Sequence, residues 1–219
     1  MILQLYEEGI EFPDPRGGEP DGLFAVGGDL SVERLLLAYS MGIFPWFSFR
    51  DCDHPMWFCP MKRFVIFPEE IHISHSMRTL RNKGIYRATF NRAFDEVIKG
   101  CSEKRIDKEG AWLGEDMIRA YTRLNELGFA ASVEVWRGEE LVGGLYGVTI
   151  GCGFFGESMF SREKDASKFA LIHLAEMMAA NGGRLIDCQF ETSHLKSMGG
   201  RFISYDEYLK ILRRPVYIS

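Results

Sequence analysis

The stretch from residue 131 to residue 190 constrains the fold most, because its elements follow one another without ambiguity. ASVEVWR alternates in polarity, GEE makes a turn and LVGGLYGVTI continues as a strand, which predicts a β-hairpin. CGFFGESMF is a third strand. A helix from Ala166 to Ala180 then ends at Asn181-Gly182-Gly183, before a strand over residues 184–190. This order predicts an α+β fold with a mixed, largely antiparallel sheet and a crossover helix.

The rest of the chain is predicted to be mainly helical and irregular. The first third is rich in Gly, Pro and aromatic residues, and it contains one clear helix that Ser31 can cap and Gly42 ends. Asn91 can cap a short helix that closes at Gly100. Two more helices are expected, over residues 115–127 and 205–213.

Composition limits the class of protein. The 219 residues carry a formal net charge of −5, which argues against binding nucleic acid along the whole surface. No apolar run approaches the roughly 20 residues that span a bilayer, and no basic segment precedes an apolar one at the N-terminus. We therefore expect a cytoplasmic globular protein that does not enter a membrane.

One segment departs from this acidic average. Residues 71–94 contain no acidic side chain. They carry five basic residues, namely Arg78, Arg81, Lys83, Arg87 and Arg92. Such a cluster can bind phosphates, because screening limits the influence of distant acids to about 8–10 Å. A solvated basic face is the simpler explanation of the same pattern.

The stretch RLIDCQF, residues 184–190, places a carboxylate in the middle of a buried strand. An ionised group in a core is costly unless it is paired or used. Positions i and i+2 of a strand share a face, so Asp187 and Gln189 are predicted to stand side by side. Ile186, Cys188 and Phe190 would face the other way. A polar pair at a sheet edge, satisfied by nearby backbone, is the alternative.

Several separate motifs point to one family. They are GGDLS-x-x-R-L-L-x-A-Y at 27–39, GIFPWF at 42–47, W-x-x-P at 57–60, GGLYG-(x)8-GESMFS at 143–161, S-K at 167–168 and LIDCQ at 185–189. In this order they closely resemble the leucyl/phenylalanyl-tRNA–protein transferase family, over nearly the whole chain.

The resemblance implies a small N-terminal domain over residues 1–62 and a GNAT-like acyltransferase domain over residues 63–219. It implies transfer of Leu, Phe or Met from aminoacyl-tRNA to a protein whose N-terminus is Arg or Lys, which marks that protein for degradation. The aminoacyl ester is already activated, so neither a cofactor nor a metal is expected. We expect a monomer.

Two other functions compete with this one. An acyl-CoA-dependent N-acyltransferase of the GNAT superfamily would cradle pyrophosphate in a Gly-rich loop before the crossover helix. Here that position is SREKDASK, without glycine. A binding module without catalysis would not need Asp187, Gln189 and Glu157 together.

The resemblance assigns roles to individual residues. Asp187 and Gln189 correspond to the proposed catalytic pair, in which the Gln189 amide holds the attacking amine or the oxyanion and Asp187 orients and polarises it. Glu157, in GESMFS, corresponds to the residue that binds the basic N-terminus of the acceptor. Trp46 and Trp112 would hold the terminal adenosine of the tRNA by stacking, with Tyr39 as a neighbouring polar contact.

The remaining assignments concern the donor. An apolar pocket for the amino-acid side chain would be lined by Leu145, Phe154, Leu171, Leu174, Met178 and Ile186. Better-known members carry phenylalanine where Leu174 and Met178 stand, so the ranking of Leu, Phe and Met as donors is open. The basic cluster in residues 71–94 would contact the tRNA backbone.

Overall fold

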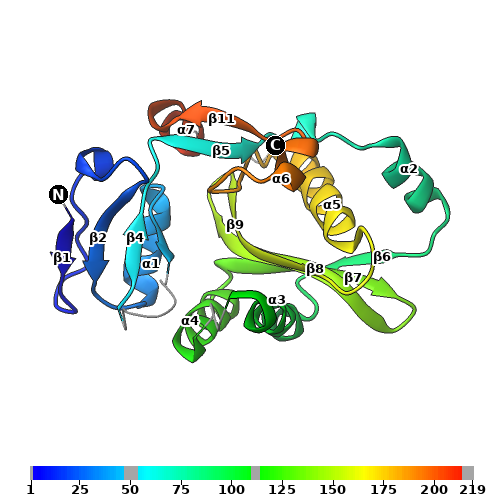
Figure 1. The fold of residues 1–219 in the computed structure, drawn as a ribbon, viewed down its shortest axis with the longest axis horizontal. Coiled ribbons are helices and arrows are strands. Elements are labelled where there is room, and N and C mark those ends of the chain that lie inside the picture. Colours follow the sequence, from blue (N-terminus) through cyan, green and yellow to red (C-terminus); the bar gives the residue numbers. More distant parts are fainter. Residues whose placement is uncertain (1, 47–53, 110–113, 214–219) are drawn as a thin grey trace.

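Two β-sheets organise the chain in the computed structural model, which describes residues 2–46, 54–109 and 114–213 (Figure 1). The first sheet has the order β1-β2-β4-β3. Its strands are β1 (Leu3–Leu5), β2 (Leu23–Gly27), β3 (Phe44–Trp46) and β4 (Met56–Phe58). Between β2 and β3 lies helix α1 (Val32–Ser40), where the Ser31 hydroxyl accepts a hydrogen bond from the Arg34 N–H as predicted.

The second sheet has seven strands in the order β11-β5-β10-β9-β8-β7-β6. Only β9 and β10 pair in parallel; the other five pairings are antiparallel. In chain order these strands are β5 (Lys62–Ile66), β6 (Arg87–Phe90), β7 (Ala130–Arg137), β8 (Glu140–Ile150), β9 (Gly153–Ser161), β10 (Leu185–Asp187) and β11 (Arg201–Ser204). The predicted hairpin, third strand and crossover are confirmed.

Helices cover both faces of the second sheet (Figure 1). The crossover helix α5 (Ala166–Ala180) packs on β7, β8 and β9 from one side. Helices α3 (Phe94–Glu109) and α4 (Glu115–Glu126) lie on the other side. The shorter elements are η1 (Pro15–Gly17), η2 (Pro68–Glu70), α2 (His75–Asn82), α6 (Ser193–Ser197) and α7 (Tyr205–Leu212). The α+β class with its mixed sheet, crossover helix and small N-terminal part is confirmed.

The prediction of a short helix from Asn91 to Gly100 was wrong. Helix α3 begins at Phe94 and continues past Gly100 to Glu109. Asn91 has a left-handed backbone with φ of 51° and precedes the helix without capping it. Gly100 is small for a packing reason, since a methyl group there would lie 3.0–3.1 Å from ring carbons of Phe160.

The sheet around β9 is irregular in two places. The pairing of β8 with β9 passes from Tyr146↔Ser158 to Gly147↔Gly156, so Glu157 is an extra residue that forms a β-bulge. On the other side of β9, strand β10 ends at Asp187, whose register partner is Phe155. The two strands therefore stop pairing just where the bulge begins.

The two sheets contact each other through α1, which packs against β8 and α4. A domain boundary after residue 62 stays a prediction. No helix among the described ranges is both long and apolar enough to cross a bilayer.

Candidate active site

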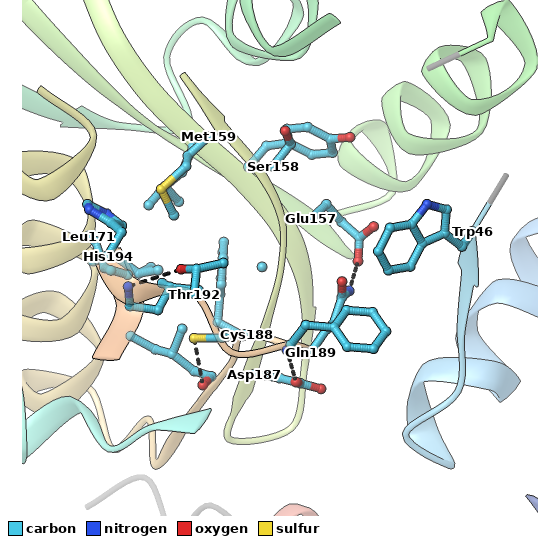
Figure 2. A pocket seen from close by; sticks show the side chains of 18 residues that line it. Trp46, Glu157, Ser158, Met159, Leu171, Asp187, Cys188, Gln189, Thr192 and His194 are labelled. Carbon is cyan, nitrogen blue, oxygen red and sulfur yellow. Dashed lines mark hydrogen bonds between the residues drawn. The ribbon is translucent and has the colours of Figure 1, made fainter. Parts of the chain in front are cut away.

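A pocket of about 300 Å³ opens where β9 and β10 part. Figure 2 shows Trp46, Glu157 and Gln189 at one end, and Met159, Leu171 and His194 at the other. Most of the lining is apolar. It includes Leu145, Phe154, Met159, Leu171, Leu174, Ile186, Phe190 and Leu195. An apolar cavity that ends at a few polar groups is the usual form of a site that binds an organic side chain in a fixed orientation.

The bulge turns Glu157 into this pocket and toward two tyrosines. Glu157 Oε1 accepts a hydrogen bond of 2.7 Å from the Tyr39 hydroxyl and one of 3.0 Å from the Gln189 amide. Its Oε2 accepts one of 3.0 Å from the Tyr121 hydroxyl. The side chain is only 6% exposed. Burial raises the pKa of Glu157 to about 7, although the tyrosine hydroxyls act in the opposite direction.

The two tyrosines also contact each other, with 2.5 Å between their hydroxyl oxygens. Tyr39 comes from α1 and Tyr121 from α4, and both are fully buried. Burial, and then the nearby Glu157 carboxylate, raise the pKa of each phenol well above 10.0. Both phenols therefore keep their protons and serve as donors at neutral pH.

Asp187 lies in a different environment. It is 1% exposed, and its carboxylate accepts hydrogen bonds of 2.7–3.0 Å from Nε and Nη2 of Arg63, which is itself fully buried. The Tyr208 hydroxyl donates a further bond of 2.6 Å. The guanidinium lies over the rings of Phe44 and Tyr208, 4.7 and 5.0 Å from their centroids. The buried acid in RLIDCQF is thus half of an ion pair that ties β10 to β5 and α7.

Gln189 does not stand beside Asp187 on one face of a strand, and that prediction was wrong. Its φ is +63°, a left-handed conformation, because the strand has already ended at Asp187. The Gln189 backbone N–H donates to Asp187 Oδ1 at 2.8 Å, whereas its side-chain amide donates to Glu157. Asp187 therefore orients Gln189 through the backbone and does not polarise its amide directly.

Of the three residues predicted to contact the terminal adenosine, the two that the structure describes have different surroundings. Trp46 lines the mouth of the pocket and packs against Phe190, with ring centroids 4.9 Å apart, and against Phe58 at 5.8 Å. Tyr39 is buried behind Glu157 instead of lining the pocket. Trp112 lies outside the described residues.

Five of the six residues that were predicted to line an apolar pocket do line this one. Leu145, Phe154, Leu171, Leu174 and Ile186 line the pocket, whereas Met178 lines a neighbouring cavity together with Phe90 and Met177. Met178 follows Leu174 by four residues on α5, so it lies one turn farther along the helix than the pocket reaches.

Several lining residues were not predicted. Ser158 and Met159 follow Glu157 directly, and the Ser158 hydroxyl is buried with no hydrogen-bond partner in the part of the chain that the structure describes. Thr192, His194 and Leu195 come from the segment at the start of α6. The bulge carries no sequence signature that would have placed Ser158 here.

The basic segment is not free of acids in space. Arg81, on α2, pairs with Glu176 of α5 at 2.6 Å. Arg87, on β6, lies 5.8 Å from the Trp136 ring centroid. Residues 71–94 contain no acid themselves, but the crossover helix α5 brings the Glu176 carboxylate into contact with them. No group of three or more His, Cys, Asp or Glu side chains in the described part of the chain could hold a metal ion.

Two family models match the chain. The model described as leucyl/phenylalanyl-tRNA protein transferase covers residues 65–213, and that of its N-terminal domain covers residues 28–61. Among curated relatives, the leucyl/phenylalanyl-tRNA–protein transferase of Syntrophobacter fumaroxidans is 50% identical over 216 residues, which are 98% of this chain and 91% of the relative. The same enzyme of Salmonella arizonae is 50% identical and that of Cellvibrio japonicus 49%, each over 97% of this chain and 90% of the relative.

Among solved structures, L-PGS from Bacillus licheniformis matches with a TM-score of 0.43 and 13% identity, over 75% of this chain and 51% of that one. The curated relatives and both family models are aminoacyl-tRNA–protein transferases, so the class of this protein is an aminoacyltransferase. The chain belongs to the leucyl/phenylalanyl-tRNA–protein transferase family.

Proposed function

We propose that this enzyme transfers Leu, Phe or Met from its aminoacyl-tRNA to the α-amine of a protein that begins with Arg or Lys, and so marks that protein for degradation. The observation that carries the proposal is the pocket itself. An apolar cavity that suits an aliphatic or aromatic side chain ends at the polar pair of Glu157 and Gln189, beside Trp46. The ester carbonyl would lie at this junction, within reach of an amine.

Each part of the site then has a task in acyl transfer. Trp46 stacks on the terminal adenine, and the donor side chain fills the cavity between β9 and α5. The Gln189 amide holds the attacking amine or the oxyanion, in a position that Asp187 fixes through the Gln189 backbone. Glu157 binds the N-terminus of the acceptor. The buried hydroxyl of Ser158 can bond the α-amino group of the donor.

The tRNA body would contact the basic segment through Arg78, Lys83, Arg87 and Arg92, with Arg81 partly neutralised by Glu176. Replacing Arg78 and Lys83 with Ala should weaken tRNA binding and flatten its salt dependence. Activity on an aminoacyl-adenosine, which lacks the tRNA body, should be spared. Equal losses with both donors would show that the segment has a structural role only. We expect the enzyme to act as a cytoplasmic monomer.

Acyl-CoA is a poor fit as the donor. The position before α5 where a pyrophosphate would sit carries Glu163 and Asp165, and Glu163 already bonds Arg137 and Tyr86. Both carboxylates are paired with cations, Glu163 with Arg137 and Asp165 with Lys168. What disfavours acyl-CoA is the absence of glycine from residues 161–168.

Mass spectrometry tests the proposal directly. A model peptide beginning with Arg, incubated with the enzyme and leucyl-tRNA, should gain the mass of one leucine residue. A matched peptide beginning with Gly should not. Acylation from acetyl-CoA at a comparable rate would overturn the proposal.

A further inference from the structure

Four oxygen atoms meet around Glu157, at the Trp46 end of the pocket, and their hydrogen bonds can be counted. The hydroxyls of Tyr39 and Tyr121 contact each other, Tyr39 contacts Oε1 of Glu157, and Tyr121 contacts Oε2. Three such contacts need three hydrogens, but the two phenols supply only two. As a carboxylate, Glu157 accepts from both phenols, and the contact between the phenols then lacks a hydrogen. When Glu157 carries a proton, it donates to Tyr121, Tyr121 donates to Tyr39 and Tyr39 donates to the other Glu157 oxygen, so every contact has a hydrogen.

The groups that face Glu157 favour this protonated form. They are the neutral phenols of Tyr39 on α1 and Tyr121 on α4, the neutral amide of Gln189, and the carboxylate of Asp187 on β10. The positive charge of Arg63 is already committed to Asp187. Glu157 therefore has no counter-ion in this site, and protonation removes the free-energy cost of burying its charge.

We propose that Glu157 is the proton acceptor in the transfer reaction: its carboxylate takes a proton from the ammonium group of the acceptor's N-terminus, and Gln189 holds the resulting amine beside it. This inference rests on the proposed function and adds a chemical role to acceptor binding. It makes Glu157 a catalytic residue and Asp187 a positioning residue, because the Asp187 carboxylate is already occupied by Arg63, Tyr208 and the Gln189 N–H.

The protons and electrons of the reaction balance. The acceptor's ammonium group carries three hydrogens and the product amide keeps one. The first proton moves to Glu157, which frees the nitrogen lone pair to form the C–N bond. The ester C–O bond then breaks and its electron pair stays on the ribose oxygen, which takes the second proton from nitrogen. Glu157 returns its proton to solvent before the next acceptor binds.

The first step is only slightly unfavourable in free energy. The pKa of Glu157 is about 7, and that of an ordinary α-amine is about 7.7–8.0. The charged pair of ammonium and carboxylate is therefore favoured over the neutral pair of amine and carboxylic acid by about one pKa unit, which is about tenfold in population. Beside an exposed Glu with the ordinary pKa of 4.5, the neutral pair would be more than about a thousandfold rarer than the charged pair.

The test is the pH profile of turnover at saturating donor and Arg-peptide, for the wild type and Glu157→Gln. In the wild type, kcat should rise with a midpoint near pH 7. In Glu157→Gln only an amine that is already neutral can react, so the midpoint should move up to about 8. The loss caused by the substitution should therefore shrink about tenfold between pH 6.5 and pH 9. The control Glu140→Gln makes the same chemical change at an exposed strand end and should leave the profile unchanged.

A purely ionic role gives the opposite trend. If Glu157 only attracts a cation, the loss in Glu157→Gln would appear in KM and would grow as pH rises, with an unchanged kcat midpoint; that result overturns the inference. Tyr121→Phe gives an independent check, because losing a donor to Glu157 should move the kcat midpoint of the enzyme upward. An unmoved midpoint there would also contradict it. A wild type that never transfers to the Arg-peptide would instead reject the proposed function.

Discussion

Two buried carboxylates, Glu157 on β9 and Asp187 on β10, lie where these strands part, and their surroundings differ. Asp187 meets a guanidinium and a phenol, so its negative charge has a positive partner at 2.7 Å. Glu157 meets two phenols and an amide, all of them neutral. Both side chains are almost completely buried. The difference in partners, and not in burial, gives the Asp187 carboxylate a counter-ion and leaves Glu157 to carry a movable proton.

This contrast also separates architecture from chemistry. The Asp187–Arg63 pair joins β10, β5 and α7, elements that are far apart in sequence, and it shapes the backbone that presents Gln189. The Glu157 cluster draws on α1, α4 and β9 and opens into the pocket. Losing a residue of the first cluster should therefore lower stability, whereas a residue of the second should act on turnover and on the pH dependence of stability.

The largest effect is expected for Asp187→Ala. It leaves the buried Arg63 guanidinium without its counter-ion, and removing one partner of such a pair destabilises a protein by about 3–5 kcal/mol. Urea denaturation measures this directly. The double variant Arg63→Met, Asp187→Leu should recover most of the loss, because a buried pair replaced by apolar side chains is often neutral. A single variant as stable as the wild type would contradict the ion-pair assignment.

Gln189→Ala should have the opposite signature. Its backbone N–H still bonds Asp187, so the free energy of unfolding should change little. The loss of one contact to the amine or oxyanion should lower kcat by about 10²–10³ with little change in tRNA affinity. Single-turnover kinetics beside thermal melts separate the two quantities. A destabilised enzyme with normal turnover would assign Gln189 to architecture.

The partners of Asp187 explain why the sequence alone could not assign a role to this residue. RLIDCQF showed a costly acid in a strand, and two outcomes, a catalytic acid and a satisfied polar group, were both open. Its partners Arg63 and Tyr208 lie 124 and 21 residues away in the chain. Nothing local in the sequence marks that pairing, and nothing local announces that Gln189 leaves the strand with a positive φ.

Other features of the fold can be predicted from the sequence alone. The hairpin, the crossover helix and the Ser31 cap follow from alternation, helical spacing and capping residues, and the sequence predicts them with nearly correct bounds. Helical spacing on α5 selects the face that carries Leu171 and Leu174, which line the pocket, whereas Leu145, Phe154 and Ile186 are expected from the family resemblance. The bulge at Glu157 could not be found, because a single extra residue in a strand pairing changes no pattern that a sequence displays.

A third prediction concerns the stability of Glu157→Gln as pH changes. The pKa of Glu157 is about 7 in the folded protein and 4.5 when exposed, so the folded state binds more protons and the wild type loses stability as pH rises from 4.5 through 7. That difference corresponds to roughly 3 kcal/mol. Gln cannot ionise, so the variant should melt at a higher temperature than the wild type above pH 7, by an amount that vanishes near pH 4.5. A pH-independent difference would contradict the raised pKa.

The smallest effect should be on donor choice. Leu174→Trp fills part of the cavity that Leu174 lines, so it should disfavour phenylalanyl-tRNA relative to leucyl-tRNA by about 10–200-fold in kcat/KM. Met178→Trp is the matched control on the same helix, because Met178 lines the neighbouring cavity. Competition between the two charged tRNAs measures the ratio. Equal shifts in both variants would mean that the cavity does not hold the donor side chain.

Infrared difference spectroscopy tests the contrast between the two acids most directly. The wild type at pH 6 minus Glu157→Gln at pH 6 should show the carbonyl stretch of a protonated carboxylic acid, which is separate from the carboxylate bands. That signal should disappear between pH 6 and pH 8 with a midpoint near pH 7, and the control Glu140→Gln should not remove it. If the spectrum at pH 6 shows Glu157 only as a carboxylate, the buried proton does not exist and the two acids do not differ as described.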